Sequence, residues 1–208
     1  MSEASLEPSG QRERWNRRYA DRGARAFPRA PAQRLIENRS LLLGTVGRHA
    51  LDVACGDGRN AAYLAQLGFE VDAVDISDVI IDKLQAAAID LGLRVNPLRL
   101  DLELDPLPAA HYDVILQFSY LQRSLFEPLA HALAPRGILI FETVMRAHAE
   151  DLGNDFDPRF LLDSQELLAS FPDLTVLRYH EGVTGRSGRP RAVASLVAQR
   201  PAATVHRS

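Results

Sequence analysis

The stretch LDVACGDGRNAAYLAQLGFEVDAVDIS (residues 51–77) decides the fold. An apolar run of strand length at 49–54 leads into a turn of small residues, and apolar side chains then recur at helical spacing. Gly68 follows this helical pattern, as glycine does just past a helix end. A second apolar run, at 71–74, ends in Asp75. Strand, glycine turn, helix, strand and acid, in this order, indicate a nucleotide-binding βαβ unit.

The residue types in this unit favour one kind of nucleotide. Gly56 and Gly58 carry no Cβ, so a ligand can approach the backbone of the turn. Asp75 is placed to accept hydrogen bonds from two ribose hydroxyls. The dinucleotide fingerprint G-x-G-x-x-G is missing, which opposes a dehydrogenase, and Asp52 and Asp57 repel a pyrophosphate but suit an ammonium group. We therefore expect an adenosine that carries an amino acid rather than NAD.

Each feature taken alone has a simpler explanation. Glycines after a strand often make only a tight turn, and an acid at position 75 also suits the N-cap of the next helix. The joint occurrence of turn and acid at this spacing, with further matches downstream, favours nucleotide binding over both.

At these residues the sequence resembles the class I S-adenosylmethionine-dependent methyltransferases. Their first motif is an acid followed by small residues at alternate positions, and Asp52, Ala54, Gly56 and Gly58 match it, with alanine where glycine is commonest. The segment CGDGRN at 55–60, together with WNRRY upstream, is similar to the tellurite-resistance and thiol-methyltransferase-like branch of small-molecule enzymes. The resemblance covers roughly residues 14–199, and its motifs specify the cofactor better than the substrate.

The resemblance implies S-adenosyl-L-methionine as cofactor, S-adenosyl-L-homocysteine as product and no metal. It places an acid at the adenine amino group, here Asp101, and the next backbone N–H, that of Leu102, at a ring nitrogen. An early helix covers the pocket in this family, and Tyr19 is our candidate for its contact, with packing as the alternative. The implied cofactor-binding residues are Asp52, Ala54, Gly56, Asp57, Gly58, Asn60, Asp75, Ile76, Asp101, Leu102, Gln117, Phe118 and Tyr19.

The substrate side is expected where later strands end, because ligands of open α/β sheets bind at the carboxyl ends of the strands. Tyr120 and Arg123 follow the apolar strand 112–118, and Arg146 and His148 follow the next one. Tyr120, His148 and Arg146 are therefore the candidate catalytic residues, although most arginines and histidines on loops have no such role. The D/N-P-P-Y signature of enzymes that methylate amino groups of nucleic acids is absent.

The resulting fold class is α/β: a doubly wound, seven-stranded, mainly parallel sheet with a C-terminal antiparallel hairpin and helices on both faces. We expect a single domain over 1–208, with flexible tails at 1–11 and 201–208 and a helical lid segment at 12–43. Ser77 is expected to cap the helix that follows it, and Asp163 or Ser164 the short helix at 164–169. The other helices are expected at 12–21, 32–43, 59–67, 78–91 and 121–133, and the strands at 49–54, 71–75, 95–100, 112–118, 138–143, 175–180 and 191–200.

Composition narrows the function classes. The chain has 208 residues and a net charge of −3, so no broad basic surface predicts binding to nucleic acid or membrane. Its one cysteine excludes an intrachain disulfide, and no Cys/His cluster has zinc spacing. Without an apolar signal core or a run of ~20 apolar residues, we expect a cytoplasmic protein, as a monomer or homodimer.

The expected reaction is direct SN2 transfer of a methyl group to a small molecule such as a thiol, a chalcogen oxyanion or another soft nucleophile. A general base is needed only for an acceptor that is protonated at neutral pH, and Tyr120, His148 and Tyr19 are candidates. Cys55 is not expected to act as a nucleophile, because it lies in the cofactor turn with no histidine near it in sequence. Two alternatives stay open: a methyltransferase acting on RNA or protein, and a non-catalytic module that binds the cofactor.

Overall fold

The computed structural model describes residues 8–21, 23, 25–27, 30–146, 157–184 and 190–203. Its strands are β1 (His49–Val53), β2 (Glu70–Asp75), β3 (Val95–Arg99), β4 (Tyr112–Phe118), β5 (Leu133–Val144), β6 (Thr175–Thr184) and β7 (Arg191–Gln199). Its α-helices are α1 (Pro8–Asp21), α2 (Gln33–Glu37), α3 (Arg39–Leu43), α4 (Arg59–Gln66), α5 (Asp78–Leu91), α6 (Phe126–Ala132) and α7 (Glu166–Ala169). Two 3-10 turns, η1 (Arg123–Leu125) and η2 (Pro158–Phe160), complete the list.

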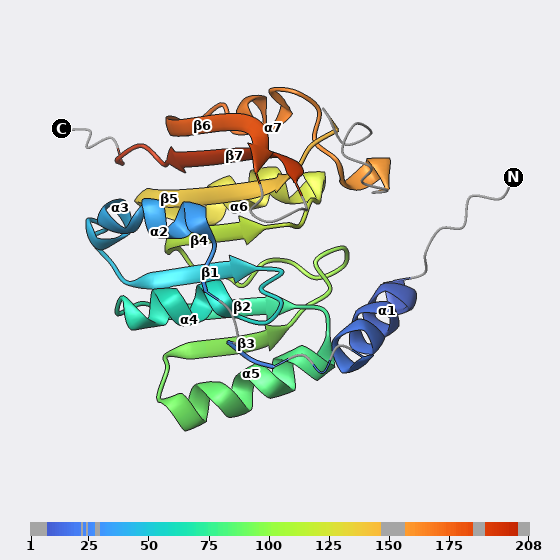
Figure 1. Cartoon of the computed structure of the whole chain (residues 1–208). Coiled ribbons are helices and arrows are strands. Elements are labelled where there is room, and N and C mark those ends of the chain that lie inside the picture. The colour runs from blue at the N-terminus through green and yellow to red at the C-terminus, as the bar shows by residue number, and fades with distance from the viewer. Residues whose placement is uncertain are drawn as a thin grey trace, which may run out of the picture. The chain divides into compact units, whose positions relative to one another are not determined.

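The seven strands have the order β3-β2-β1-β4-β5-β7-β6, which confirms the expected fold class (Figure 1). By internal contacts the chain divides into two compact units. The first comprises the described residues of Met1–Arg39 and Arg48–Pro108, and the second those of Ser40–Gly47 and Ala109–Ser208.

The first unit is a parallel three-stranded βαβ structure. Strands β1, β2 and β3 pair in parallel, with Ala50 opposite Val71 and Val71 opposite Val95. Helix α4 packs on β1 and β2, helix α5 packs on β2 and β3, and α1 lies against α5 (Figure 1). Gly68 (φ 93°) follows α4 and Gly92 (φ 61°) ends α5, in the left-handed backbone region where glycine carries no penalty. The helices and strands predicted around this turn are confirmed here.

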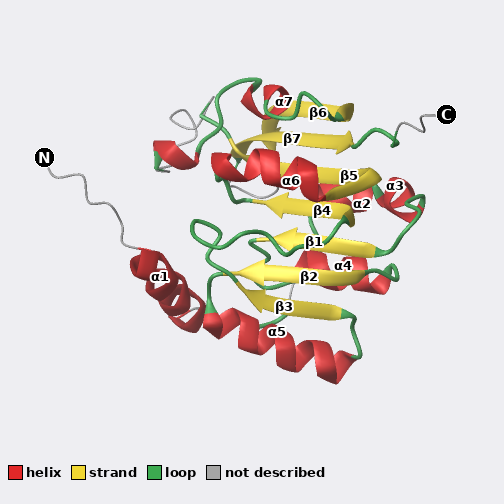
Figure 2. Ribbon diagram, turned by 180° about the vertical axis from the view of Figure 1, so that it is seen from behind, coloured by secondary structure: helices red, strands yellow, loops and turns green. Residues whose placement is uncertain are grey.

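The second unit combines a parallel pair with the antiparallel hairpin. Strand β5 pairs in parallel with β4 and antiparallel with β7, and β7 pairs antiparallel with β6. Helix α6 packs on β5 and α7 packs on β7 (Figure 2). The rings of Phe126, Phe141 and Phe171 form a cluster with centroid separations of 5.4–6.3 Å, which fixes α6 against β5.

Several predicted boundaries are wrong. The helix expected at 32–43 is two short helices, α2 and α3, separated at Asn38, whose buried side chain donates to the carbonyl of Arg34. The helix expected at 121–133 is the η1 turn followed by α6. Strand β5 already begins at Leu133 rather than at residue 138, and residues 134–137 lie inside it as an irregularity, with Arg136 at φ 67°. Helix α1 begins at Pro8 rather than residue 12, and proline suits a first helical turn.

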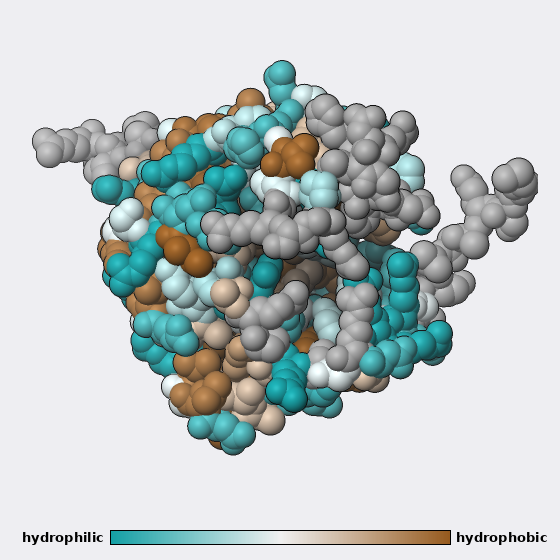
Figure 3. All heavy atoms as spheres, in the orientation of Figure 1, coloured by the Kyte–Doolittle hydropathy of each residue, from teal (hydrophilic) through white to brown (hydrophobic). Residues whose placement is uncertain are grey.

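The surface and the helices show two further properties. In Figure 3, apolar side chains gather over the end of α5, where Ile89 and Leu91 are exposed. None of the helices in the described ranges is both long and apolar enough to cross a membrane.

Candidate functional site

The turn after β1 has a left-handed backbone at alternate positions. Ala54, Gly56 and Gly58 have φ values of 53°, 56° and 74°. A Cβ at Gly58 would collide with the side chains of Leu84 and Phe27, so residue 58 is restricted to glycine by both its backbone and its neighbours. Ala54 adopts the same backbone region with a Cβ, which costs about 1–2 kcal/mol relative to glycine. The small residues therefore fit a turn whose backbone is left-handed at positions 54, 56 and 58.

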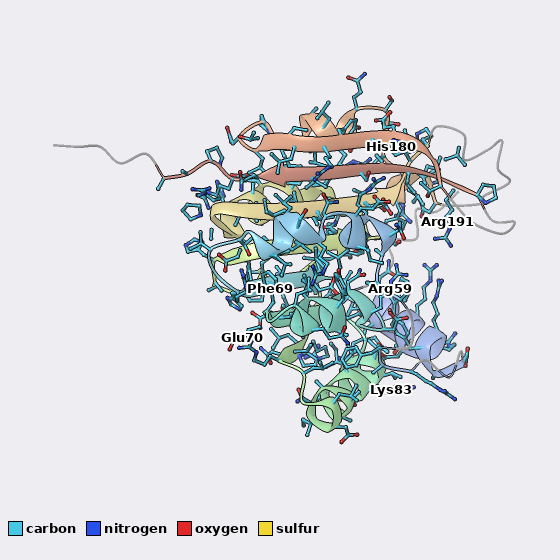
Figure 4. All side chains as sticks on the ribbon, turned by 60° about the vertical axis from the view of Figure 1, so that its left-hand side comes forward. Arg59, Phe69, Glu70, Lys83, His180 and Arg191 are labelled. Atoms are coloured by element: carbon cyan, nitrogen blue, oxygen red, sulfur yellow. The ribbon has the colours of Figure 1, made fainter. Side chains whose placement is uncertain are left out.

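Asp52, at the end of β1, is a buried carboxylate with an unused oxygen. The backbone N–H of Ala61 lies near the carboxylate, while Oδ2 has no hydrogen-bond partner among the described residues. Burial raises the pKa of Asp52 from 3.8 to about 7, helped by Asp57 and Asp75 and opposed by the N–H of Ala61 and by Arg59. Figure 4 shows Arg59 at the start of α4. A buried acceptor of this kind suits a cationic hydrogen-bond donor.

Asp75, at the end of β2, is also buried, and each of its carboxylate oxygens accepts a backbone hydrogen bond. The N–H of Gly56 donates to Oδ2 and the N–H of Ser77 to Oδ1, both at 3.0 Å. The N–H of Ile76 and the hydroxyl of Tyr19 lie near this carboxylate. Burial raises the pKa of Asp75, while these four polar groups lower it. The acid is thus tied to the glycine turn through Gly56.

Helix α1 is docked beside this acid by contacts that the sequence analysis missed. Arg12 Nε and Asn16 Nδ2 donate to Asp78 Oδ2 at 2.7 and 3.3 Å. Asn16 Oδ1 accepts from the hydroxyl of Ser77 at 2.6 Å and from the N–H of Val79 at 3.4 Å. Ser77 occupies the N-cap position of α5, as predicted, but its side chain makes no capping bond, and Asn16 supplies the acceptor from 63 residues away.

Other predicted residues of the first unit lie in or beside the turn. Asn60 is buried, and its Oδ1 accepts from the N–H of Ala32 at 2.9 Å, so the structure gives it a role in holding α2. The carbonyl of Asp57 accepts from the N–H of Phe27 at 2.7 Å. Burial raises the pKa of Cys55 well above its ordinary value, and a protonated thiol agrees with the expectation that it is no nucleophile.

The loop after β3 brings Asp101 and Leu102 into the same unit. The N–H of Leu100 donates to the carbonyl of Asp75 at 3.0 Å, which places Asp101 one residue beyond the strand pairing. Asp101 Oδ1 accepts from the N–H of Glu103 at 3.1 Å, and Leu102 is buried. Their expected adenine contacts stay predictions.

In the second unit, polar side chains follow β4. Gln117 is fully buried: its Nε2 donates to the carbonyl of Tyr120 at 3.1 Å, and its Oε1 has no partner among the described residues. Phe118 is buried beside it, and Ser119 has a left-handed backbone (φ 57°). The hydroxyl of Tyr120 donates a hydrogen bond to Gln122 Oε1, which fixes the orientation of the phenol.

The arginines of the second unit hold the chain segment that contains η2 and α7. Arg123 Nε and Nη2 donate to the two carboxylate oxygens of Glu166 at 2.6 and 2.9 Å. Arg146 Nε donates to Asp163 at 2.9 Å. Arg123, which we expected near the substrate, therefore forms a bidentate ion pair with Glu166. Arg146 is also paired, with Asp163. His148 lies outside the described residues.

The short helix α7 also differs from expectation. It begins at Glu166, after Gln165 in a left-handed backbone (φ 61°), and no side chain caps its first turn. Glu181 accepts from the hydroxyl of Ser164 at 2.8 Å, so the predicted caps, Asp163 and Ser164, are wrong.

The structure therefore collects most predicted cofactor residues in the first unit. Those of the first unit are Tyr19, Asp52, Ala54, Gly56, Asp57, Gly58, Asn60, Asp75, Ile76, Asp101 and Leu102, and those of the second are Gln117 and Phe118. Tyr120 and Arg146, the described candidate catalytic residues, belong to the second unit. Within the described ranges, no group of three or more His, Cys, Asp or Glu side chains is arranged to hold a metal.

Comparisons with known proteins find similarity to methyltransferases. Residues 50–137 match a family model described as a methyltransferase domain. The ubiquinone biosynthesis O-methyltransferase of Coxiella burnetii (strain RSA 493 / Nine Mile phase I) is 31% identical over 105 residues, 48% of this chain and 45% of that protein. The uncharacterized methyltransferase YodH of Bacillus subtilis is 33% identical over 95 residues, 43% of this chain and 40% of that protein. The chain thus spans about half the length of the curated relatives it matches.

Solved structures share the fold. TehB from Haemophilus influenzae superposes with a TM-score of 0.71 at 18% identity, covering 89% of this chain and 67% of that chain. Magnesium protoporphyrin IX methyltransferase from Synechocystis PCC 6803 with bound SAH gives 0.67 at 17%, covering 93% and 100%. At these identities the likeness shows the fold alone.

Proposed function

We propose that this chain is a class I S-adenosylmethionine-dependent methyltransferase and transfers a methyl group from S-adenosyl-L-methionine to a small molecule. The observation that carries the proposal is the hydrogen bond from the N–H of Gly56 to Asp75 Oδ2 at 3.0 Å, because it holds the acid that we assign to the ribose beside the glycine turn. The matched family segment, 50–137, contains both residues.

The residues of the first unit fit the parts of this cofactor. The unpaired Oδ2 of Asp52 offers an acceptor to the ammonium group of the methionine part. Asp75 serves the ribose, and Asp101 with the N–H of Leu102 serves the adenine. Gly56 carries no Cβ, so the ligand can lie against the turn there.

Methyl transfer from a sulfonium depends more on the relative positions of donor and acceptor than on proton transfer. When bound, the sulfonium supplies an activated methyl group: its S–CH₃ bond breaks as the bond from acceptor to carbon forms, and the electron pair remains on sulfur as S-adenosyl-L-homocysteine. The chain holds donor and acceptor in line and excludes water. We assign acceptor positioning to Tyr120 and Arg146, with His148 as a further candidate. Gln122 Oε1 accepts a hydrogen bond from the Tyr120 hydroxyl, so the phenol keeps its proton. We therefore expect Tyr120 to orient the substrate rather than to remove a proton from it.

The acceptor that we propose is a soft nucleophile, a thiol or a chalcogen oxyanion, which needs little help from a base. The curated relatives named as O-methyltransferases support an oxygen acceptor as the second candidate. An assay with labelled S-adenosyl-L-methionine against thiols, chalcogen oxyanions and phenols separates the two, and product formation with any of them excludes a purely binding module.

Calorimetric titration tests the cofactor assignment. S-adenosyl-L-homocysteine should bind, and Asp75→Asn should weaken its binding tenfold or more, about 1.4 kcal/mol, because one ribose acceptor is lost. Asp72→Asn is the matched control: Asp72 lies in the same strand, but its carboxylate is bonded to His49 and Asn96. Binding of NAD without binding of either adenosyl ligand would overturn the proposal.

A further inference from the structure

Gln117, near the end of β4, contains a buried hydrogen-bond acceptor without a donor. Its side chain is 0% exposed, and Nε2 donates to the carbonyl of Tyr120 at 3.1 Å. Oε1 accepts from no group among the described residues. A buried polar atom that is left unpaired destabilises a folded protein, so its presence needs an explanation. This amide oxygen is a position where a donor group of a ligand can bind.

The direction of the Gln117 amide is fixed by the loop that follows β4. The carbonyl of Tyr120 can only accept, so turning the amide over would set two acceptors against each other. The hydroxyl of Tyr120 donates in turn to Gln122 Oε1, and Gln122 Nε2 donates to Ser124 Oγ at 3.0 Å. These hydrogen bonds hold the loop, and they keep Oε1 turned away from the Tyr120 carbonyl.

The unpaired oxygen lies at the end of the sheet where ligands of open α/β sheets bind. Gln117 is opposite Phe141 in the parallel register, so the two side chains project to the same face, which α6 covers on β5 (Figure 2). The ring of Phe141 packs there at 5.9 Å from that of Phe126. In such apolar surroundings a hydrogen bond to a ligand is stronger than in water.

The chain passes from this buried amide to an exposed residue within two positions. Ser119 is exposed and has a left-handed backbone (φ 57°), although it is not a glycine. Its N–H donates to the carbonyl of Glu142 at 2.9 Å, which holds the strained backbone against β5. Strained residues of this kind cluster at binding and catalytic sites. The observation supports a ligand at the carboxyl end of β4.

Arg123, the first cation after β4, is committed to the protein. Its Nε and Nη2 donate to Glu166, Nη1 donates to the carbonyl of Arg159 at 2.9 Å, and Nη2 also donates to that of Leu161 at 3.0 Å. An anionic substrate would have to break a bidentate ion pair to reach this guanidinium. What Gln117 offers is an uncharged acceptor, which fits a neutral donor group better than an anion.

A donor bound at Oε1 cannot be the atom that receives the methyl group. An amide oxygen accepts a hydrogen bond but does not take up the proton, so the bound group keeps it. The reacting atom must direct a lone pair at the methyl carbon; as that bond forms, the S–CH₃ bond breaks, its electron pair stays on sulfur, and any proton on the reacting atom leaves to water. The substrate therefore needs a second polar group.

We propose that Gln117 Oε1 determines specificity by accepting a hydrogen bond from a hydroxyl or amine that the substrate carries next to the atom to be methylated. The two groups are neighbours because Gln117 is bonded to Tyr120, which we assign to substrate positioning. The inference rests on the proposed function and narrows its substrate class to thiols and phenols with an adjacent donor. It also assigns Gln117 to the substrate, whereas the resemblance implied a cofactor contact.

The test compares substrates that differ only in this donor. Methyl transfer from labelled S-adenosyl-L-methionine is measured with 2-hydroxythiophenol against 2-methoxythiophenol, and with catechol against 2-methoxyphenol. The methoxy compounds keep the second oxygen but have no proton to donate. The wild type should prefer the hydroxyl member of at least one pair about tenfold or more in kcat/KM, because a site that pairs with a substrate hydroxyl rejects the analogue without it.

Gln117→Met keeps the length of the side chain and removes the acceptor. The preference should fall to about one in this variant, through a loss with the hydroxyl compound, while the affinity for S-adenosyl-L-homocysteine stays unchanged. Gln199→Met is the matched control: its Nε2 also donates to a backbone carbonyl, that of Arg136, but near the start of β5, and its preference should equal that of the wild type. The wild-type comparison needs no variant to fold, and thermal unfolding checks the two variants.

A wild type without preference for the hydroxyl compounds would overturn the inference, as it would if water fills the position at Oε1. Equal preference in wild type and Gln117→Met would overturn it too. Tenfold weaker binding of S-adenosyl-L-homocysteine to a folded Gln117→Met would return the residue to the cofactor. In these three cases the proposed function stands as long as the wild type binds S-adenosyl-L-homocysteine. If the wild type does not bind it, the proposed function is wrong and the inference fails with it.

Discussion

The substitution Asp52→Asn should remove a pH-dependent loss of folding stability that the buried carboxylate causes in the wild type. The wild-type carboxylate is buried, and burial raises its pKa from 3.8 to about 7. Asparagine has almost the same shape, keeps an acceptor for the N–H of Ala61 and cannot ionise. The substitution therefore isolates the charge of residue 52 from its packing.

The magnitude follows from proton binding in the folded and unfolded states. Above pH 5 the unfolded chain has already released this proton, whereas folded Asp52 keeps it until the pH reaches about 7. The folded state therefore binds more protons in this window, and stability falls as the pH rises. Two pH units at 1.36 kcal/mol each give a loss of about 3 kcal/mol between pH 5 and pH 7, with little further change above.

Urea unfolding of wild type and Asp52→Asn at pH 5 and pH 8 measures this difference. The wild type should lose about 3 kcal/mol more than the variant over the interval, and Asp52→Asn should be the more stable protein at pH 8. Other titrating groups, Asp75 among them, are common to both proteins and cancel in the comparison. Parallel pH profiles for the two proteins would refute the reasoning, because Asp52 would then ionise alike in the folded and unfolded chains.

Three further outcomes are expected. Gly58→Ala should destabilise the protein by more than about 2 kcal/mol in urea unfolding, because its Cβ meets Leu84. Gly68→Ala, with a similar backbone but open space, should lose only about 1–2 kcal/mol. Asn16→Ala should cost about 1 kcal/mol and speed hydrogen exchange at the start of α5; unchanged exchange there would contradict the capping role. Binding of S-adenosyl-L-homocysteine at pH 7 should release about half a proton as its ammonium lowers the pKa of Asp52, measured by calorimetry in buffers of different ionisation enthalpy; zero release would contradict the contact.

The first unit was predictable because its signals are local. Apolar runs, glycines at helix ends and the small residues of the turn each act on their own few neighbours, and the strands and helices from 49 to 99 are found close to where the sequence places them. Ala54 stands where the family motif most often has glycine, and it still adopts a left-handed backbone conformation.

The contacts that were missed connect residues far apart in the sequence. Asn16 reaches Ser77 across 61 residues, and Arg123 reaches Glu166 across 43. Nothing in the spacing of an asparagine or an arginine identifies such a partner, since each also suits a solvent-exposed helix face. Ser77 was assigned as a cap for a sound local reason and was overridden by a tertiary contact.

Asp52 and Asp75 differ in how far their carboxylate oxygens are hydrogen-bonded, and we expect them to contribute differently to ligand affinity. Asp52 has an oxygen without a donor, so a ligand ammonium there adds a bond and relieves a buried polar group. Each oxygen of Asp75 already accepts a backbone N–H, from Gly56 or from Ser77, so a ribose hydroxyl there joins an acid that is already paired. The larger gain in affinity should therefore come from the amino-acid end of the ligand.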